Sequence, residues 1–112
     1  MNLLPDADKA VLKIEKLKDY CLNNLHPVGK HKARVFQSVL GLNADNAEEL
    51  KNFILEKIKK NKAILGETDK YGQRYVVDMI FSKYNKQVVI RTSWIIKTGT
   101  NYPCFTSCYI KM

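Results

Sequence analysis

The ten residues from Gln87 to Ile96 restrict the fold more than any other segment of the chain. β-Branched and aromatic side chains dominate this segment, which contains neither Gly nor Pro, and such a composition favours a β-strand. Successive side chains of a strand point to opposite faces. One face then carries the side chains that we expect in the core: Val88, Ile90, Thr92, Trp94 and Ile96. The other face is expected to be the more exposed one and carries Val89, Arg91, Ser93 and Ile95.

Other segments in the second half of the chain also predict strands. They begin at Ala63, span residues 73–81 and span residues 104–111. The connections between the strands contain Gly, Asn or Asp, which favour turns, and lie at 69–72, 83–86 and 98–101. Consecutive strands that are joined by short turns pair antiparallel. The sequence therefore predicts an antiparallel meander of three or four strands.

The first half of the chain predicts helices instead. Apolar side chains recur at helical spacing over residues 14–23, which end at Asn23-Asn24, and over residues 30–40, after which Gly41 is a suitable C-cap. A third helix opens at Asp45 or Asn46, with acidic residues first and lysines last, as the helix dipole prefers. We expect one α+β domain over residues 1–112, with the N-terminal helices packed on one face of the C-terminal sheet. The other face would remain open for a ligand.

The chain carries a formal net charge of +8, from 19 Lys and Arg against 11 Asp and Glu. This excess favours a polyanionic partner, either nucleic acid or an acidic protein. No apolar run reaches the ~20 residues of a membrane-spanning helix, and the N-terminus does not resemble a secretory signal, so we expect a cytoplasmic protein with no membrane partner. The three cysteines, Cys21, Cys104 and Cys108, have no zinc-site spacing, and we interpret them as reduced structural thiols.

The segment from His26 to Phe36 is the strongest candidate for chemistry. It places two imidazoles and several cations at the start of a predicted helix, where backbone N–H groups also favour an anion such as phosphate. Histidine can transfer protons near neutral pH, and fixed cations such as Lys32 and Arg91 can stabilise a charged transition state. A hydroxyl from Tyr71 or Thr106 can orient a phosphoryl oxygen. These groups suffice for metal-independent RNA cleavage in which the ribose 2′-OH attacks the adjacent phosphorus.

Each candidate also has a structural alternative. His26 precedes Pro27 and can simply hold a turn, and His31 is more typical of a solvated helix residue. Lys32 and Arg34 are two residues apart on a helix, so at most one of them can point into a site. No further ligands accompany the two histidines, so we predict no metal and no cofactor. From the residues alone, the chain is a basic α+β domain that binds RNA or an acidic partner.

Several motifs, in order along nearly the whole chain, resemble a bacterial domain family of formally unknown function that occurs alone in small operons and at the C-termini of polymorphic toxins. The matching segments are Leu4-Pro5-Asp6-Ala7, Ala10-Val11, Tyr20-Cys21-Leu22-Asn23, His26-Pro27-Val28-Gly29, Lys32-Ala33-Arg34-Val35-Phe36, Leu40-Gly41-Leu42, Tyr71-Gly72, Tyr75-Val76-Val77-Asp78, Arg91-Thr92, Trp94-Ile95-Ile96 and a last strand with Thr106. These domains are similar to the toxin nucleases grouped with barnase, EndoU, colicin and RelE, whose N-terminal helices pack on a C-terminal antiparallel sheet.

The resemblance implies an RNA-cleaving toxin that acts on tRNA or on mRNA at the ribosome. The polar members of its motifs, which we take as candidate catalytic residues, are His26, Lys32, Tyr71, Arg91, Thr92 and Thr106. Further RNA contacts are expected from Lys30, His31, Arg34 and Arg74. Lys30 replaces a second glycine that many relatives carry. No delivery region precedes the motifs, which favours the toxin of a toxin–antitoxin pair, neutralised by a small acidic protein. The alternative is a non-catalytic module that binds RNA or protein and inhibits by occupancy.

Overall fold

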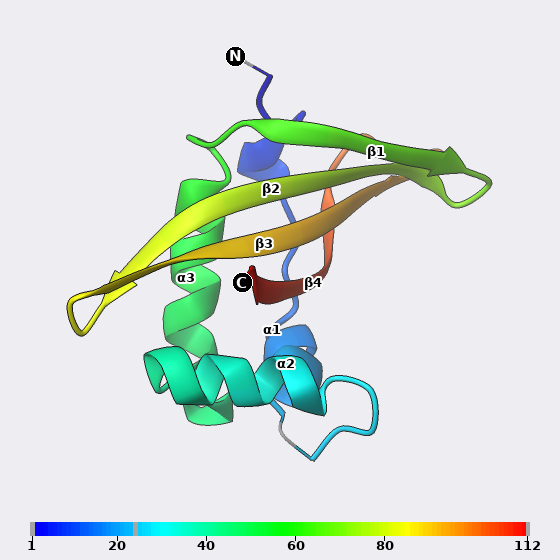
Figure 1. Cartoon of the computed structure of the whole chain (residues 1–112). Helices are drawn as coiled ribbons and strands as arrows, with labels where there is room; N and C mark the ends of the chain where they lie inside the picture. The colour runs from blue at the N-terminus through cyan, green and yellow to red at the C-terminus, as the bar shows by residue number, and fades with distance from the viewer. Residues whose placement is uncertain (1, 24, 112) are drawn as a thin grey trace.

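The computed structural model describes residues 2–23 and 25–111. Met1, Asn24 and Met112 lie outside the described residues, so the predicted helix end at Asn24 lies there too. Helices occupy the first half of the chain and a sheet occupies the second half (Figure 1). The predicted α+β fold, with N-terminal helices before an antiparallel sheet, is therefore confirmed.

All three predicted helices are present. The short helix α1 (Ile14–Lys16) continues directly into wider π-helical turns over Leu17–Cys21, and α2 (Lys30–Val35) does the same over Phe36–Leu40. Gly41 ends the second helix with φ 67°, a left-handed conformation that glycine adopts at low cost.

The third helix, α3 (Ala47–Lys57), follows a 3₁₀ turn over Ala44–Asn46. The side chain of Asn43 accepts a hydrogen bond from the backbone N–H of Asp45, and the side chain of Asn46 accepts one from the backbone N–H of Asn43. These bonds satisfy N–H groups that the start of a helix leaves unpaired. The start of this helix thus lies close to the predicted position.

The sheet contains four antiparallel strands in the order of the chain: β1 (Ala63–Asp69), β2 (Gly72–Lys83), β3 (Lys86–Lys97) and β4 (Cys104–Lys111). The tight turn between β2 and β3 is formed by Tyr84 and Asn85, which both have positive φ. Two consecutive residues with positive φ give a two-residue turn whose twist matches that of the two strands it joins. The strands β2 and β3 pair without interruption over their whole length, which places Asp78 opposite Arg91.

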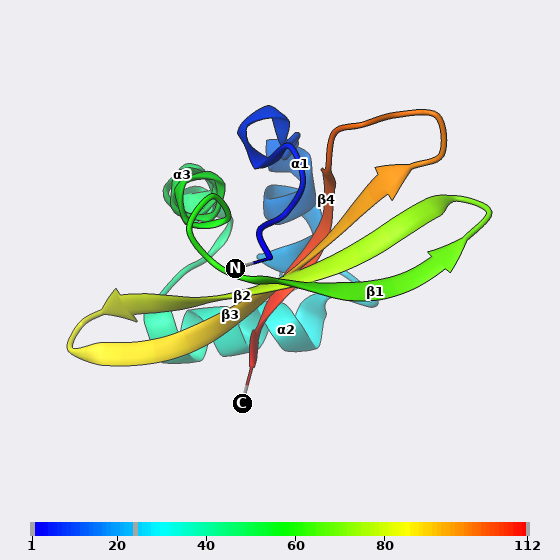
Figure 2. The ribbon, with the colours of Figure 1, turned by 90° about the horizontal axis from the view of Figure 1, so that it is seen from above.

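The helices α1 and α3 lie on the same side of the sheet, behind it in Figure 1 and above it in Figure 2. The buried hydrophobic side chains of the helices and of this sheet face form one cluster. Its largest fully buried members are Trp94, Phe36, Leu17, Leu40, Leu42, Leu50, Ile54, Ile58, Met79, Ile90 and Val77. The predicted core residues Ile90, Thr92 and Trp94 of β3 are therefore buried as expected.

The end of β3 differs from the prediction. Ile95 is buried although it was assigned to the exposed face, and Ile96 is only half-buried. The pairing of β3 with β4 shifts register between Ser93 and Trp94, and Ile95 lies opposite Cys104. Cys104 in turn pairs with Val11 in an isolated parallel β-bridge. The backbone N–H of Val11 donates to the carbonyl oxygen of Pro103, and its carbonyl oxygen accepts from the N–H of Phe105. The N-terminal segment thus adds to the sheet beside Ile95, a long-range contact that strand alternation does not reveal.

Candidate functional site

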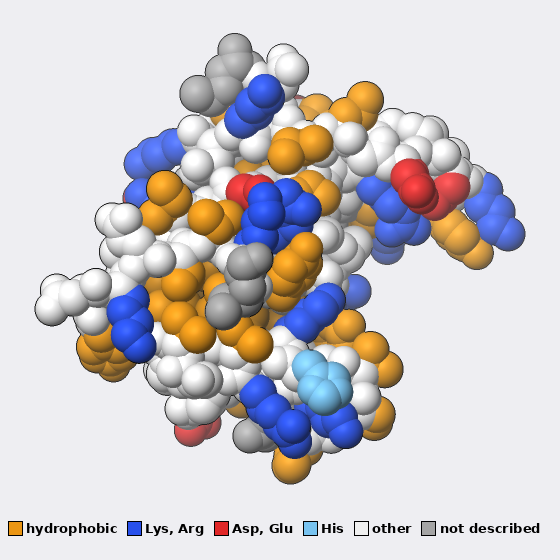
Figure 3. Space-filling model, viewed as in Figure 1, with side chains coloured by type: hydrophobic (Ala, Val, Ile, Leu, Met, Phe, Trp, Pro, Cys, Tyr) orange, Lys and Arg blue, Asp and Glu red, His pale blue; other side chains and the backbone are white. Residues whose placement is uncertain are grey.

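The face of the sheet turned away from α1 and α3 carries polar side chains in neighbouring rows, and we call it the open face. Pairing across the strands aligns Val76 with Ser93 and Ser107, and aligns Asp78 with Arg91 and Tyr109. Side chains of the intervening residues, such as Val77 and Thr92, point into the core. The open face looks toward the viewer in Figure 3, where basic and hydrophobic groups gather around a small acidic one.

Arg91 and Asp78 form a two-point ion pair at the centre of the open face. The Nε and Nη2 atoms of Arg91 donate to the two carboxylate oxygens of Asp78, at 2.8 and 2.9 Å. The hydrogen bonds from Arg91 hold the pKa of Asp78 below its usual range, although partial burial opposes this shift. The same bonds, with a smaller contribution from Tyr109, raise the pKa of Arg91. Both groups are therefore charged at neutral pH.

Two lysines approach this pair from different elements. Lys111 of β4 places its Nζ 3.5 Å from a carboxylate oxygen of Asp78. Lys32 of α2 places its Nζ 4.8 Å from the centroid of the Tyr109 ring, which is the open-face neighbour of Arg91. We call these five residues (Lys32, Asp78, Arg91, Tyr109 and Lys111) the Arg91 cluster. It holds three cations and one carboxylate, so it attracts an anion.

A groove of about 340 Å³ adjoins the Arg91 cluster on the open face. It is lined by Gly66, Glu67, Arg74, Tyr75, Val76, Ser93, Trp94, Thr106 and Ser107. Val76 and Ser93 lie in the row next to Asp78 and Arg91, because two residues separate the rows on each strand. The groove and the cluster are thus two parts of one surface.

Of the predicted catalytic residues, the structure brings Lys32 and Arg91 together in the cluster and places Thr106 in the adjoining groove. The predicted RNA-binding residue Arg74 lines the same groove. The predicted exposure of Arg91 and Ser93 on one face holds, since both are half-exposed. Lys32, Arg74, Arg91 and Thr106 come from four different elements, α2, β2, β3 and β4.

His26 occupies a turn and not the open face. Its Nδ1 accepts hydrogen bonds from the backbone N–H groups of Val28 and Gly29, both at 3.0 Å, and its ring packs edge-on against Tyr20 at 4.8 Å. The turn that precedes α2 therefore depends on this ring. No hydrogen bond or ring contact among residues 2–23 and 25–111 joins His26 to the Arg91 cluster. The structural alternative for His26 fits this geometry.

Thr92 must be corrected as a catalytic candidate, because its side chain lies in the core. The residue is fully buried, its hydroxyl donates to the carbonyl oxygen of Val77 at 2.7 Å, and it accepts from Nε1 of Trp94 at 2.8 Å. The hydroxyl thus satisfies the indole N–H and has no access to a substrate. Its neighbour Arg91 points to the opposite face, so the two cannot share a site.

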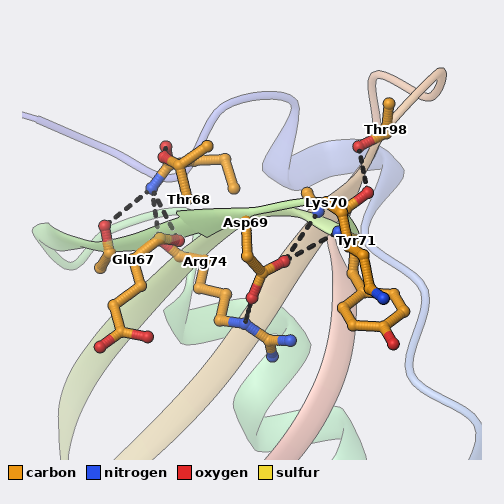
Figure 4. A network of polar contacts seen from close by, with 10 residues as sticks. Glu67, Thr68, Asp69, Lys70, Tyr71, Arg74 and Thr98 are labelled. Carbon is orange, nitrogen blue, oxygen red and sulfur yellow. Dashed lines mark hydrogen bonds and ion pairs between the residues drawn. The ribbon is translucent and has the colours of Figure 1, made fainter.

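Tyr71 lies at the β1–β2 turn, where Figure 4 shows it with Asp69, Lys70 and Thr98. Asp69 accepts hydrogen bonds from the backbone N–H groups of Tyr71 and Gly72, which lowers the pKa of this carboxyl, and it also pairs with Arg74 at 3.2 Å. Gly72 is six residues from Asp78 along β2, about 20 Å for an extended strand. Tyr71 is therefore remote from the Arg91 cluster.

The remaining RNA-binding candidates lie on α2. His31 and Arg34 are exposed, and Lys30 is half-buried at the first turn of the helix. Lys32 is the residue of this helix that contacts the sheet side chain Tyr109. The expectation that only one of Lys32 and Arg34 points toward the site agrees with this contact.

Sequence reasoning missed Asp78, Tyr109, Lys111 and Ser107 as site residues. Asp78 offered one signal, because a carboxylate within an apolar strand calls for a cationic partner. Finding the pair requires the register of β2 against β3, which the short Lys83–Lys86 turn sets. Tyr109 and Ser107 follow only from the shifted register of β4.

Among the described residues, no three His, Cys, Asp or Glu side chains converge as metal ligands do. The cysteines carry free thiols. Cys21 and Cys108 meet in the core, where the backbone N–H of Cys108 approaches Cys21 Sγ at 3.4 Å and burial raises the pKa of the Cys108 thiol. None of the helices in the described part of the chain is long and apolar enough to cross a membrane.

Neither the curated proteins nor the solved structures include a match to this chain. One family model does match, over residues 3–112, which is nearly the whole chain. The motifs that bear the resemblance and the residues of the Arg91 cluster all fall within that range. The chain belongs to the family described as a domain of unknown function, DUF6883.

Proposed function

We propose that this domain is an endoribonuclease toxin that binds RNA on the open face and cleaves it at the Arg91 cluster. One observation carries the proposal: on the sheet face turned away from α1 and α3, Arg91 and Lys111 contact the carboxylate of Asp78, and Lys32 of α2 lies over the neighbouring Tyr109 ring. Such an arrangement suits a phosphodiester, whose charge it balances. The resemblance to toxin nucleases supports RNA as the polymer, and the net charge of +8 is consistent with a polyanionic partner.

The reaction needs no group from outside the chain. The ribose 2′-OH transfers its proton to the carboxylate of Asp78, the 2′-oxygen forms a bond to phosphorus, and the bond from phosphorus to the 5′-oxygen breaks. The Tyr109 hydroxyl gives a proton to the leaving oxygen. The products are a 2′,3′-cyclic phosphate and a 5′-hydroxyl. Arg91, Lys32 and Lys111 stabilise the negative charge that develops on the phosphoryl oxygens.

The lowered pKa of Asp78 makes it a weak base. Proton transfer to Asp78 depends on RNA being bound with its 2′-OH next to the carboxylate. The bound phosphate competes for the Arg91 hydrogen bonds and so raises the basicity of the carboxylate. The guanidinium has five N–H donors and uses two of them for Asp78. The others can engage the phosphate.

The same surface would receive the neutralising partner. A small acidic protein that covers the Arg91 cluster would block RNA binding. Its carboxylates would take the positions that RNA phosphates occupy at the cluster. Electrostatic attraction makes such an association fast and sensitive to salt.

A non-catalytic binding module is the second candidate, and the Arg91–Asp78 pair itself favours it. Paired Asp and Arg side chains also occur as structural ion pairs, and a carboxylate with a lowered pKa is poorly suited to accept a proton. A module of this kind would inhibit by stoichiometric occupancy of RNA. Its variants would lose binding and toxicity together, without cleaved RNA at any stage.

Induced expression in a bacterial host separates the two candidates. We expect growth arrest and discrete RNA fragments from the unaltered chain, and neither from Arg91→Ala. Lys59→Ala is the matched control, because it removes an exposed cation that follows α3 and lies outside the cluster. Arrest with intact RNA would favour the binding module. Arrest and fragmentation that persist in Arg91→Ala would remove the cluster from the site.

A further inference from the structure

The groove of the open face lies between two irregularities of the sheet. The pairing of β1 with β2 shifts between Leu65 and Thr68, and the pairing of β3 with β4 shifts between Ser93 and Trp94. The residues at these shifts, Gly66 and Glu67 on one side and Thr106 on the other, are groove residues. Bulges bend a strand and redirect its side chains, and they are frequent beside functional sites. The two shifts therefore hollow the sheet next to the Arg91 cluster.

The polar groups of the groove can both donate and accept hydrogen bonds. Within residues 2–23 and 25–111, the hydroxyls of Ser93, Thr106 and Ser107 make no hydrogen bond to another protein group. Glu67 and Arg74 extend to the same side of the β1–β2 hairpin, and Asp69 holds the guanidinium of Arg74 in place (Figure 4). Val76 adds an apolar surface. Such a mixture fits a flat polar heterocycle, whose edges need donors and acceptors and whose faces are apolar.

The size and position of the groove further limit the class of ligand that fits it. A volume of about 340 Å³ is at the small end of ligand pockets, sufficient for one nucleoside. Ser93 is two residues from Arg91 on β3, about 7 Å along the strand. This spacing matches the step from a phosphate to the sugar and base attached to it.

We propose that the groove binds the nucleoside adjacent to the phosphate held by the Arg91 cluster. The proposal rests on the proposed function, because it takes the cluster as a phosphate site. It adds a second site on the same face, through which the domain selects the nucleotide next to the cleaved bond. Glu67 accepts from, and Arg74 donates to, the edge of the base, while the three hydroxyls line the opposite wall.

Titration of the ¹⁵N-labelled protein tests this directly, with the four nucleoside 3′-monophosphates and inorganic phosphate as probes. We expect inorganic phosphate to shift the amide signals around Arg91 and Tyr109 only. The nucleotides should also shift those of Val76, Ser93 and Ser107, with one or two bases binding more tightly than the others. Ser107→Leu, which fills the groove, should weaken nucleotide binding about tenfold, as expected for the loss of base contacts, and leave phosphate binding unchanged.

Ser82→Leu is the matched control, because Ser82 is an exposed residue of β2 on the same face, six residues from Val76. Its nucleotide binding should equal that of the unaltered chain. Ser93→Leu provides a second filling variant, and the amide spectrum reports whether each variant folds. Nucleotides that shift only the Arg91 signals would overturn the groove proposal and leave the proposed function standing. If neither phosphate nor nucleotide shifts the Arg91 signals, the phosphate site and with it both proposals are wrong.

Discussion

Arg91 and Asp78 face each other across the β2–β3 pair and share two hydrogen bonds of 2.8 and 2.9 Å on the open face. Each side chain is about one quarter exposed, so the pair is partly shielded but remains accessible to a ligand. Lys111 also contacts the carboxylate of Asp78, while Tyr109 lies beside the guanidinium. The pair thus links charged and polar side chains of β2, β3 and β4 on the open face.

Asp78→Asn should lower the free energy of unfolding at pH 7 by about 1 kcal/mol, because it removes a partly buried, two-point ion pair. The folded-state pKa of Asp78 is lowered, so its contribution is present above the ordinary aspartate pKa of about 3.9 and is lost as the pH falls through the folded value. Urea unfolding at several pH values should show the difference from the unaltered chain shrinking below pH ~4. A difference that grows in acid would contradict the assignment.

Thr92→Val should destabilise the domain by about 1–3 kcal/mol, because it leaves the indole N–H of Trp94 buried without a partner. Thr98→Val is the control: its exposed hydroxyl donates to the carbonyl oxygen of Lys70, and the cost should stay below about 0.5 kcal/mol. Chemical unfolding followed by Trp94 fluorescence measures both. Equal stability of the Thr92→Val protein would show that the hydroxyl is dispensable to the core.

His26→Ala should reduce stability by about 1 kcal/mol without abolishing RNA cleavage, since the imidazole accepts two backbone N–H groups in the turn before α2. His31→Ala, on the exposed surface of the same helix, should change neither property. Stability and RNA cleavage are measured on the same protein samples at a temperature where each variant is folded. Complete loss of cleavage by a folded His26→Ala protein would return His26 to the catalytic site.

Lys32→Ala should weaken RNA binding and lower the slope of log K against log salt by about one, because one phosphate contact is lost. Lys32→Arg keeps the charge and should retain most of the affinity. Lys59→Ala, which removes an exposed cation outside the open face, serves as the control. Fluorescence anisotropy with labelled single-stranded RNA at several salt concentrations gives the slopes. An unchanged slope for Lys32→Ala would exclude Lys32 from the RNA contact.

The helices, the strands and the face that carries Arg91 could be predicted because local signals agree with them. Gly41 ends one helix, the Asn85 turn sets the β2–β3 register, and alternation along β3 separates Arg91 from Trp94. Two-residue periodicity also placed Thr92 in the core, whereas its motif position suggested catalysis; the structure agrees with the periodicity. A polar residue among buried strand positions is more simply explained as a hydrogen-bond partner for a neighbouring indole N–H than as a contact to substrate.

The composition of the site could not be predicted, because it depends on long-range register. The shift beside Thr106 determines that Tyr109 lies next to Arg91, and no local pattern marks a bulge of this kind. The contact of Lys32 with Tyr109 depends on how α2 meets β4. One histidine before a proline is compatible with both a catalytic group and a turn, and the structure adds that the His26 ring accepts two backbone hydrogen bonds within the turn.

The end groups of RNA cut during induced expression test the central claim most directly. Attack by the 2′-OH at the Arg91 cluster predicts fragments with 2′,3′-cyclic phosphate and 5′-hydroxyl ends. These fragments should be absent from cells that express the Asp78→Asn protein at the same level, although this variant still binds RNA. Fragments that carry 5′-phosphate and 3′-hydroxyl ends, or that persist in the Asp78→Asn strain, would contradict the account.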